Sequence, residues 1–117
     1  KKGEYDDLEN AMFDAKEGLT MLNSRPDDAK AKIMSAISAW ESALDELDMD
    51  DKKARINKKV APDLYKNILL GYAMVQEFDR ADDHFSSSLR LGFNNRDEND
   101  LKELKLLIDD LRERYQK

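Results

Sequence analysis

A pattern of five residues occurs twice in this chain, at a constant separation of 45 residues. The residues Ile33, Ala36, Trp40, Ala43 and Leu44 correspond to Phe78, Ala81, Phe85, Ser88 and Leu89. Both copies read large, small, aromatic, small, leucine, at the spacing of one face of an α-helix. A duplicated packing pattern of this kind predicts a stack of helical hairpins that bury a shared core.

The composition agrees with one all-α domain and excludes several functions. The 117 residues are enough for a single domain, and hydrophobic residues make up 40% of them. A net charge of −6 repels phosphate backbones, so we expect no nucleic-acid partner. No apolar run approaches the roughly 20 residues of a membrane span, so we expect no direct membrane insertion. The chain has no cysteine, which excludes disulfides and thiolate metal sites.

The apolar periodicity predicts about five helices in antiparallel helix-turn-helix hairpins, with the last helix as a C-terminal cap. Pro26, followed by two aspartates, predicts a helix start. Asp79 is expected to cap the fourth helix, and Gly92 to end it in the left-handed conformation. Pro62 either kinks a long helix or begins a new one. The expected organisation is a first hairpin at about 4–47, a basic insertion at about 51–61, a second hairpin at about 62–92 and a capping helix at about 99–115.

The stretch from Leu64 to Leu91 resembles a tetratricopeptide repeat (TPR). The matching positions are Tyr65, Ile68, Leu69 and Tyr72 in a first helix, and Phe78, Ala81, Phe85 and Leu89 in a second. The earlier segment from Ile33 to Leu44 matches the second helix of another repeat. The chain departs from the family where Leu69 replaces a small residue, Gln76 replaces the turn glycine and Ser88 replaces alanine. The resemblance implies a right-handed stack that presents a binding surface.

We find no arrangement of residues that predicts catalysis, a metal site or a cofactor. His84 is the only histidine, so a zinc site lacks a second imidazole, and we expect a surface or boundary residue. The acidic residues from Asp45 to Asp51 fail as a calcium loop, because Lys53 and Lys59 stand where glycine and glutamate are required. The chain is therefore predicted not to be an enzyme.

Two surfaces are candidates for binding. The resemblance implies a peptide groove lined by the first helix of each hairpin, and its candidate residues are Asn10, Asp14, Lys66, Asn67 and Lys102. Asp6 and Glu103 stand where the carboxylate-clamp subset of the family needs basic residues, so we predict no clamp. The other surface is a basic strip formed by Lys52, Lys53, Arg55, Lys58 and Lys59. This strip is either a solvated helical face or a docking site for an acidic partner.

The sequence thus predicts a non-catalytic scaffold or adaptor module that binds a protein or peptide. The alternative is a structural or oligomerising helical bundle within a larger, exported or lipid-anchored protein. The apolar stripe from Leu104 to Leu111 either completes the fold or pairs two chains as a homodimer. The compartment stays open between the cytoplasm and, if an N-terminal signal has been removed, the periplasm or cell surface.

Overall fold

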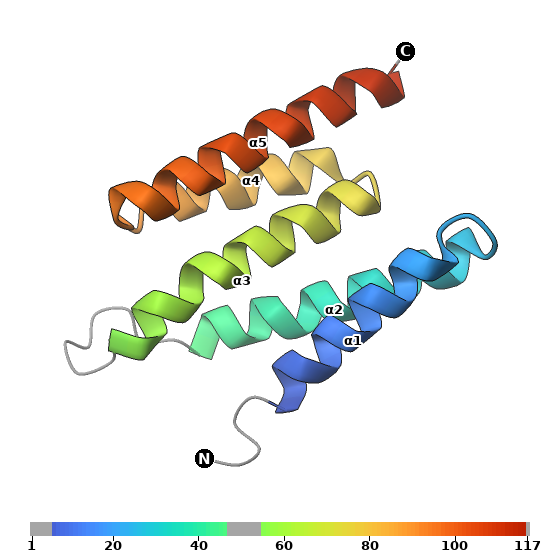
Figure 1. The fold of residues 1–117 in the computed structure, drawn as a ribbon, viewed down its shortest axis with the longest axis horizontal. Coiled ribbons are helices and arrows are strands. Elements are labelled where there is room, and N and C mark those ends of the chain that lie inside the picture. Colours follow the sequence, from blue (N-terminus) through green and yellow to red (C-terminus); the bar gives the residue numbers. More distant parts are fainter. Residues whose placement is uncertain (1–5, 47–54, 117) are drawn as a thin grey trace.

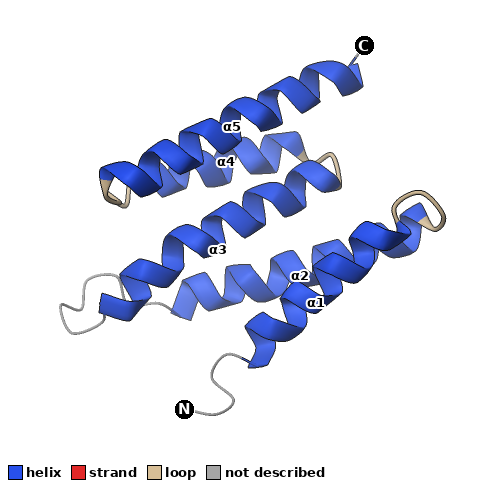
Figure 2. Ribbon diagram, viewed as in Figure 1, coloured by secondary structure: helices blue, strands red, loops and turns tan. Residues whose placement is uncertain are grey.

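The computed structural model describes the backbone of residues 6–46 and 55–116, and the side chains of residues 13–45 and 60–115. This part of the chain consists of five helices and contains no strand (Figure 2). The helices are α1 (Asp6–Met21), α2 (Pro26–Glu46), α3 (Arg55–Met74), α4 (Phe78–Leu89) and α5 (Asn95–Gln116). The predicted all-α class is confirmed.

The helices are arranged in two layers. In Figure 1, α1, α3 and α5 lie nearer to the viewer than α2 and α4. Each helix up to α4 packs against the next one in the chain, and α5 packs against both α3 and α4. Short turns connect α1 to α2 and α3 to α4. Because α5 has neighbours on one side only, much of its surface stays exposed.

A single hydrophobic core runs through the stack. Its fully buried side chains include Ile33 and Ile37 of α2, Ile68 and Leu69 of α3, and Leu101 and Ile108 of α5. Fully burying one such side chain contributes about 1.5–3 kcal/mol. Trp40 and Tyr72 belong to the same core, as the apolar stripes of α2 and α3 predict. Ser88 is buried among them, and its hydroxyl donates a hydrogen bond of 2.6 Å to the carbonyl of Phe85.

Close helix packing depends on two glycines. A Cβ atom at Gly71 of α3 would lie 2.7 Å from Cγ1 of Ile37 on α2, and one at Gly18 of α1 would lie 2.8 Å from Cγ1 of Ile33. Both distances are shorter than carbon atoms tolerate. Glycine at these positions therefore lets α1 and α3 approach α2 closely.

The α3 helix starts earlier than the expected second hairpin. It begins at Arg55, so residues 55–61 of the predicted basic insertion are the first two turns of a helix. Pro62 lies inside this helix and is fully buried. Pro62 therefore does not begin a new helix but lies within one long helix. A proline there removes one backbone hydrogen bond of α3, which burial of its ring helps to offset.

The α5 helix also starts earlier than predicted, at Asn95 and not near residue 99. The cause is a local cap. The side-chain oxygen of Asn94 accepts a hydrogen bond of 2.8 Å from the backbone N–H of Asp97, and the Asn94 carbonyl accepts another from Glu98 at 3.0 Å. Asparagine is among the best N-cap residues, so the polar segment after Asn94 is helix rather than linker.

The turn between α3 and α4 forms without glycine. Gln76 has a φ of 62°, its N–H bonds to the carbonyl of Ala73, and the N–H of Glu77 bonds to the carbonyl of Tyr72. This pair of bonds defines a Schellman motif, with Gln76 in its left-handed position. Glu77 precedes α4 without a side-chain cap, so the prediction that Asp79 caps this helix was wrong. The left-handed conformation predicted for Gly92 is confirmed by its φ of 66°.

None of the helices in the described ranges combines the length and apolar character needed to cross a bilayer. Several sequence predictions lie outside the described residues. They concern segment 47–51, whose polar residues predict a connection between helices, with Asp50 or Asp51 expected from the sequence to cap the helix that follows.

Candidate functional site

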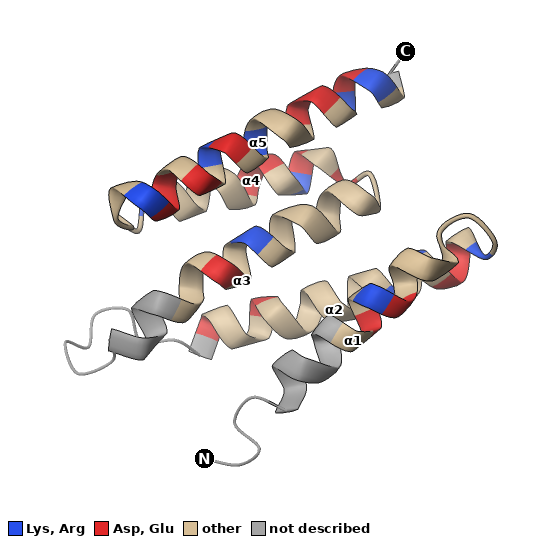
Figure 3. Ribbon diagram, in the orientation of Figure 1, with Lys and Arg blue, Asp and Glu red and all other residues tan. Residues whose placement is uncertain are grey.

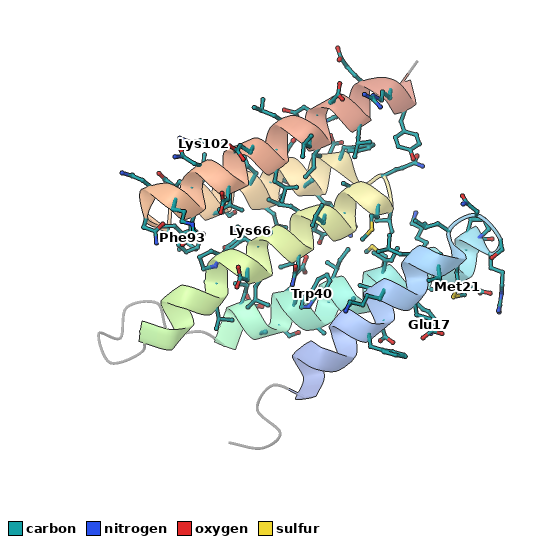
Figure 4. The ribbon with its side chains drawn as sticks, in the orientation of Figure 1. Glu17, Met21, Trp40, Lys66, Phe93 and Lys102 are labelled. Carbon is teal, nitrogen blue, oxygen red and sulfur yellow. The ribbon has the colours of Figure 1, made fainter. Side chains whose placement is uncertain are left out.

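The predicted groove residues lie on the layer formed by α1, α3 and α5. Asp14 is half-buried on α1, Lys66 and Asn67 are half-buried on α3, and Lys102 is exposed on α5. Figure 4 shows Lys66 on α3 and Lys102 on α5. The backbone of Asn10 belongs to α1, but its side chain lies outside the described residues. The structure therefore places the groove candidates on alternate helices of one layer.

Lys66 connects α3 to α5. Its Nζ atom lies 3.3 Å from Oδ2 of Asp100 and 3.8 Å from Oδ1 of Asp97, both on α5, and 4.0 Å from Oδ1 of Asp63. Three carboxylates around one ammonium group neutralise its charge. Lys66 therefore contributes to the packing of α3 against α5 and is not free to bind a partner.

Lys102 does not lie on the face of α5 that contacts Lys66. Asp100 faces α3 through its bond to Lys66, and a residue two positions along a helix points to nearly the opposite side. The residues at helical spacing from Asp100 on its own side are Leu104, Leu107 and Leu111. On the side of α5 that faces α3, leucines therefore follow the two aspartates that contact Lys66, and Lys102 does not line a common surface with Lys66.

Exposed leucines follow this contact along both helices. Leu70 on α3, four residues after Lys66, is exposed, and so are Leu107 and Leu111 on α5. Figure 3 shows that α3 carries no charged residue from Asn67 to its end, whereas charges of both signs alternate along α5. We call Leu70, Leu104, Leu107 and Leu111 the leucine stripe.

The basic strip is described only in part. Arg55, Lys58 and Lys59 belong to the first turns of α3. Their side chains lie outside the described residues, as do Lys52 and Lys53 entirely. The hypothesis of an acidic partner docking there remains a prediction.

A polar cluster that sequence reasoning missed connects α2, α3 and α4. The Tyr72 hydroxyl donates a hydrogen bond to Oε1 of Glu41 on α2, and Nε2 of His84 on α4 lies 3.1 Å from the same oxygen. A carboxylate only accepts, so the His84 contact is a hydrogen bond when Nε2 carries the proton. The other ring nitrogen, Nδ1, is buried and has no hydrogen-bond partner among the described residues.

Aromatic rings enclose this cluster. The His84 ring lies 5.4 Å from the Tyr72 ring and 6.0 Å, edge-on, from that of Tyr65. Burial, then the hydrogen bond and charge of Glu41, raise the pKa of Tyr72 to about 12. The pKa of Tyr65 is also raised, first by burial and then by the charge of Asp45. Both hydroxyls therefore stay neutral near neutral pH.

A cleft opens beside the cluster. Its volume is about 350 Å³, within the range of small ligand sites. It is lined by Glu41, Leu44, Asp45, Ala61, Tyr65, His84, Ser87 and Leu91. The lining comes from the carboxyl-terminal halves of α2 and α4, from Ala61 and Tyr65 of α3, and from Leu91 just after α4. The ends of α2 and α4 lie at the left of Figure 1.

No local sequence signal marks this cluster. Glu41 is separated from Tyr72 by 31 residues and from His84 by 43. The only hint was that His84 directly precedes Phe85, an apolar position of the repeated pattern. That position favours a residue at the boundary of the core, as observed, but it does not identify the partner.

A second network joins α4 to α5. Arg112 donates hydrogen bonds to Asp79 at 2.7 Å and to Asp82 at 2.8 Å, and Lys105 lies 2.7 Å from Asp82. Burial opposes ionisation of Asp82, but the hydrogen bonds from Lys105 and Arg112 outweigh it and lower the pKa of this carboxyl. The network connects α5 to α4. Asp79 does not act as a cap because α4 already begins at Phe78, one residue before it.

Comparison of the chain with protein-family models, with curated proteins and with solved structures gives no match in any of the three. The functional argument therefore depends on the geometry described above.

Proposed function

We propose that this chain is a TPR-like, right-handed stack of antiparallel hairpins capped by α5, and that it serves as a non-catalytic scaffold or adaptor. In this proposal a peptide or protein partner binds the layer formed by α1, α3 and α5. The hairpins are α1 with α2 and α3 with α4.

The equivalent aromatic residues of the two hairpins support the repeat. Trp40 on α2 lies beside Gly71 of α3, and the ring of Phe85 on α4 lies 5.8 Å from Nζ of Lys105 on α5. Each therefore faces the helix that follows its own hairpin. Ala36 and Ala81, at the equivalent small position, are both fully buried.

The contact between Lys66 and Asp100 gives independent support. These residues are 34 positions apart, which is the length of one repeat in the family. In Figure 1, α3 and α5 both run from left to right. The parallel course brings Leu70 and Leu104, each four residues after this contact, to the same level of the two helices.

The leucine stripe is the observation that carries the proposed binding function. Leu107 keeps 64% of its surface exposed, and Leu70 keeps 46%. Adjacent exposed leucines on neighbouring helices favour an interaction site, because water is displaced from them when a partner binds. Asn67, between Lys66 and Leu70 on α3, would supply a polar contact to the partner backbone.

One observation favours the alternative, an oligomerising bundle. Leu106 is 69% exposed but lies on the other flank of α5, at helical spacing from Lys102. A second copy of the chain that packed on this flank would use Leu106 and leave the leucine stripe open.

The pair Leu106 and Leu107 provides a matched experiment, because the two leucines are adjacent and almost equally exposed. A random peptide library is selected on the purified chain, and affinities are measured for the wild type and the serine variants. We expect Leu107→Ser to weaken the selected peptides roughly tenfold, because a central apolar contact is worth about 1–2 kcal/mol. Leu106→Ser should bind like the wild type, and Asn67→Ala should cause a smaller loss.

Equal losses from both serine variants, or no effect of Leu107→Ser, would refute the groove. Sedimentation tests the alternative directly. A dimer that dissociates in either serine variant would identify the oligomerising bundle instead, and dissociation in Leu107→Ser would place its interface on the predicted stripe from Leu104 to Leu111.

A further inference from the structure

The cleft beside Glu41 and His84 is lined by residues of α2, α3 and α4 and by Leu91 just after α4, and none of them belongs to the groove candidates or to the leucine stripe. We propose that this cleft binds the side chain of an arginine supplied by a partner polypeptide. The inference does not depend on the leucine stripe, and either one can fail without the other.

The first argument is the charge of the lining. Glu41 and Asp45 are one helical turn apart on α2, and both line the cleft. Like charges at this spacing repel and destabilise a helix by a few tenths of a kcal/mol. A cation between them removes the repulsion and gains two attractive contacts.

The second argument is the remaining hydrogen-bonding capacity of Glu41. Tyr72 and His84 both bond to Oε1, and no residue in the described ranges bonds to Oε2. Asp45 adds two more acceptor oxygens at the mouth of the cleft. The guanidinium group carries five N–H donors in a planar fork, which suits several carboxylate oxygens better than the compact ammonium of lysine.

The third argument is the shape and chemistry of the walls. Leu44, Ala61 and Leu91 supply apolar surface for an aliphatic stem, and Tyr65 adds an aromatic ring, to which a guanidinium is attracted. Burial raises the pKa of Tyr65 first, and the negative charge of Asp45 raises it further, so this carboxylate lies close enough to act on the Tyr65 hydroxyl. An amphipathic cation therefore matches both parts of the lining, and an anion matches neither.

The test uses His84, whose imidazole signals are unique in a proton NMR spectrum because the chain has one histidine. The probes are arginine and citrulline, each acetylated at its amine and amidated at its carboxyl. Citrulline has nearly the same shape but carries no charge. We expect arginine to shift the His84 ring protons in a saturable manner and citrulline to leave them unchanged.

Three variants test whether the arginine probe binds in the cleft. Asp45→Asn should weaken the arginine probe about threefold, in line with one exposed ion pair. Asp27→Asn removes the same charge from the other end of α2 and should leave the affinity unchanged. Ser87→Lys places a competing cation in the cleft and should abolish the saturable shift.

Thermal unfolding first establishes that all three variants are folded, as expected for exposed positions. The proposal is overturned if citrulline and arginine give equal shifts. It is also overturned if Asp27→Asn weakens binding as much as Asp45→Asn, because the attraction is then the general field of an acidic chain. A saturable shift that survives Ser87→Lys would place the arginine elsewhere.

Discussion

Replacing Gln76 by glycine should stabilise this protein, although glycine normally weakens a fold. Gln76 holds a φ of 62° at the end of α3, a conformation that costs a residue with a Cβ atom about 1–2 kcal/mol. Glycine removes that cost but adds about 0.4–1 kcal/mol of entropy to the unfolded chain. The difference favours the variant by about 0.5–1 kcal/mol, or roughly 3 °C in the melting temperature of a domain of this size.

Two further variants separate the backbone effect from loss of the side chain. Gln76→Ala keeps the strained φ and loses only an exposed side chain, so its stability should equal that of the wild type. Gly92→Ala reverses the experiment, because Gly92 has a φ of 66° and an added Cβ atom meets nothing within 4 Å. It should therefore lose about 0.5–1 kcal/mol through the backbone alone.

Urea unfolding of the four proteins, followed by circular dichroism, measures these differences. The reasoning is refuted if Gln76→Gly is no more stable than Gln76→Ala. Equal stability would mean that the Schellman motif holds glutamine without strain.

The remaining predictions concern the core and the two polar networks. Trp40 is 3% exposed, so its fluorescence should be emitted at short wavelength and shift to longer wavelength only on unfolding. The pKa of Tyr72 is raised to about 12, so its neutral phenol contributes its full stabilisation below pH 10, and this contribution is lost as the pH rises from 10 to 12. Replacing this residue, in Tyr72→Phe, should therefore flatten that part of a profile of stability against pH. Ile108→Ala should destabilise the chain by about 2–5 kcal/mol in urea unfolding, whereas Arg112→Met should cost under about 1 kcal/mol, because a surface ion pair contributes less than a buried isoleucine.

The sequence predicted the helical class and the main buried stripes, because apolar residues at helical spacing have few other solutions. It also predicted the conformation of Gly92, where glycine follows the last apolar turn of α4. Helix starts were less accurate, because polar residues mark both linkers and caps. Asn94 acts as a cap only because its side-chain oxygen accepts a hydrogen bond from the backbone N–H of Asp97. From the sequence alone, the nearby Asn99 was an equally suitable cap residue.

The polar cluster was beyond sequence reasoning for a different physical reason. The bonds from Tyr72 and His84 to Glu41 require α3 and α4 to pack on α2 in one register. Side-chain spacing within a helix carries no information about that register. Only the repeated pattern placed the helices next to one another, and it specified apolar contacts alone.

The departure at Leu69 has a structural compensation. A small residue is usual there in the family, yet Leu69 is fully buried in the core. The close approach between helices occurs two residues later, where Gly71 meets Ile37 of α2. A step of two positions corresponds to a rotation of about 200° around α3, so Gly71 and Leu69 lie on different sides of this helix. Gly71 packs against the preceding hairpin, and Leu69 fills space on another side.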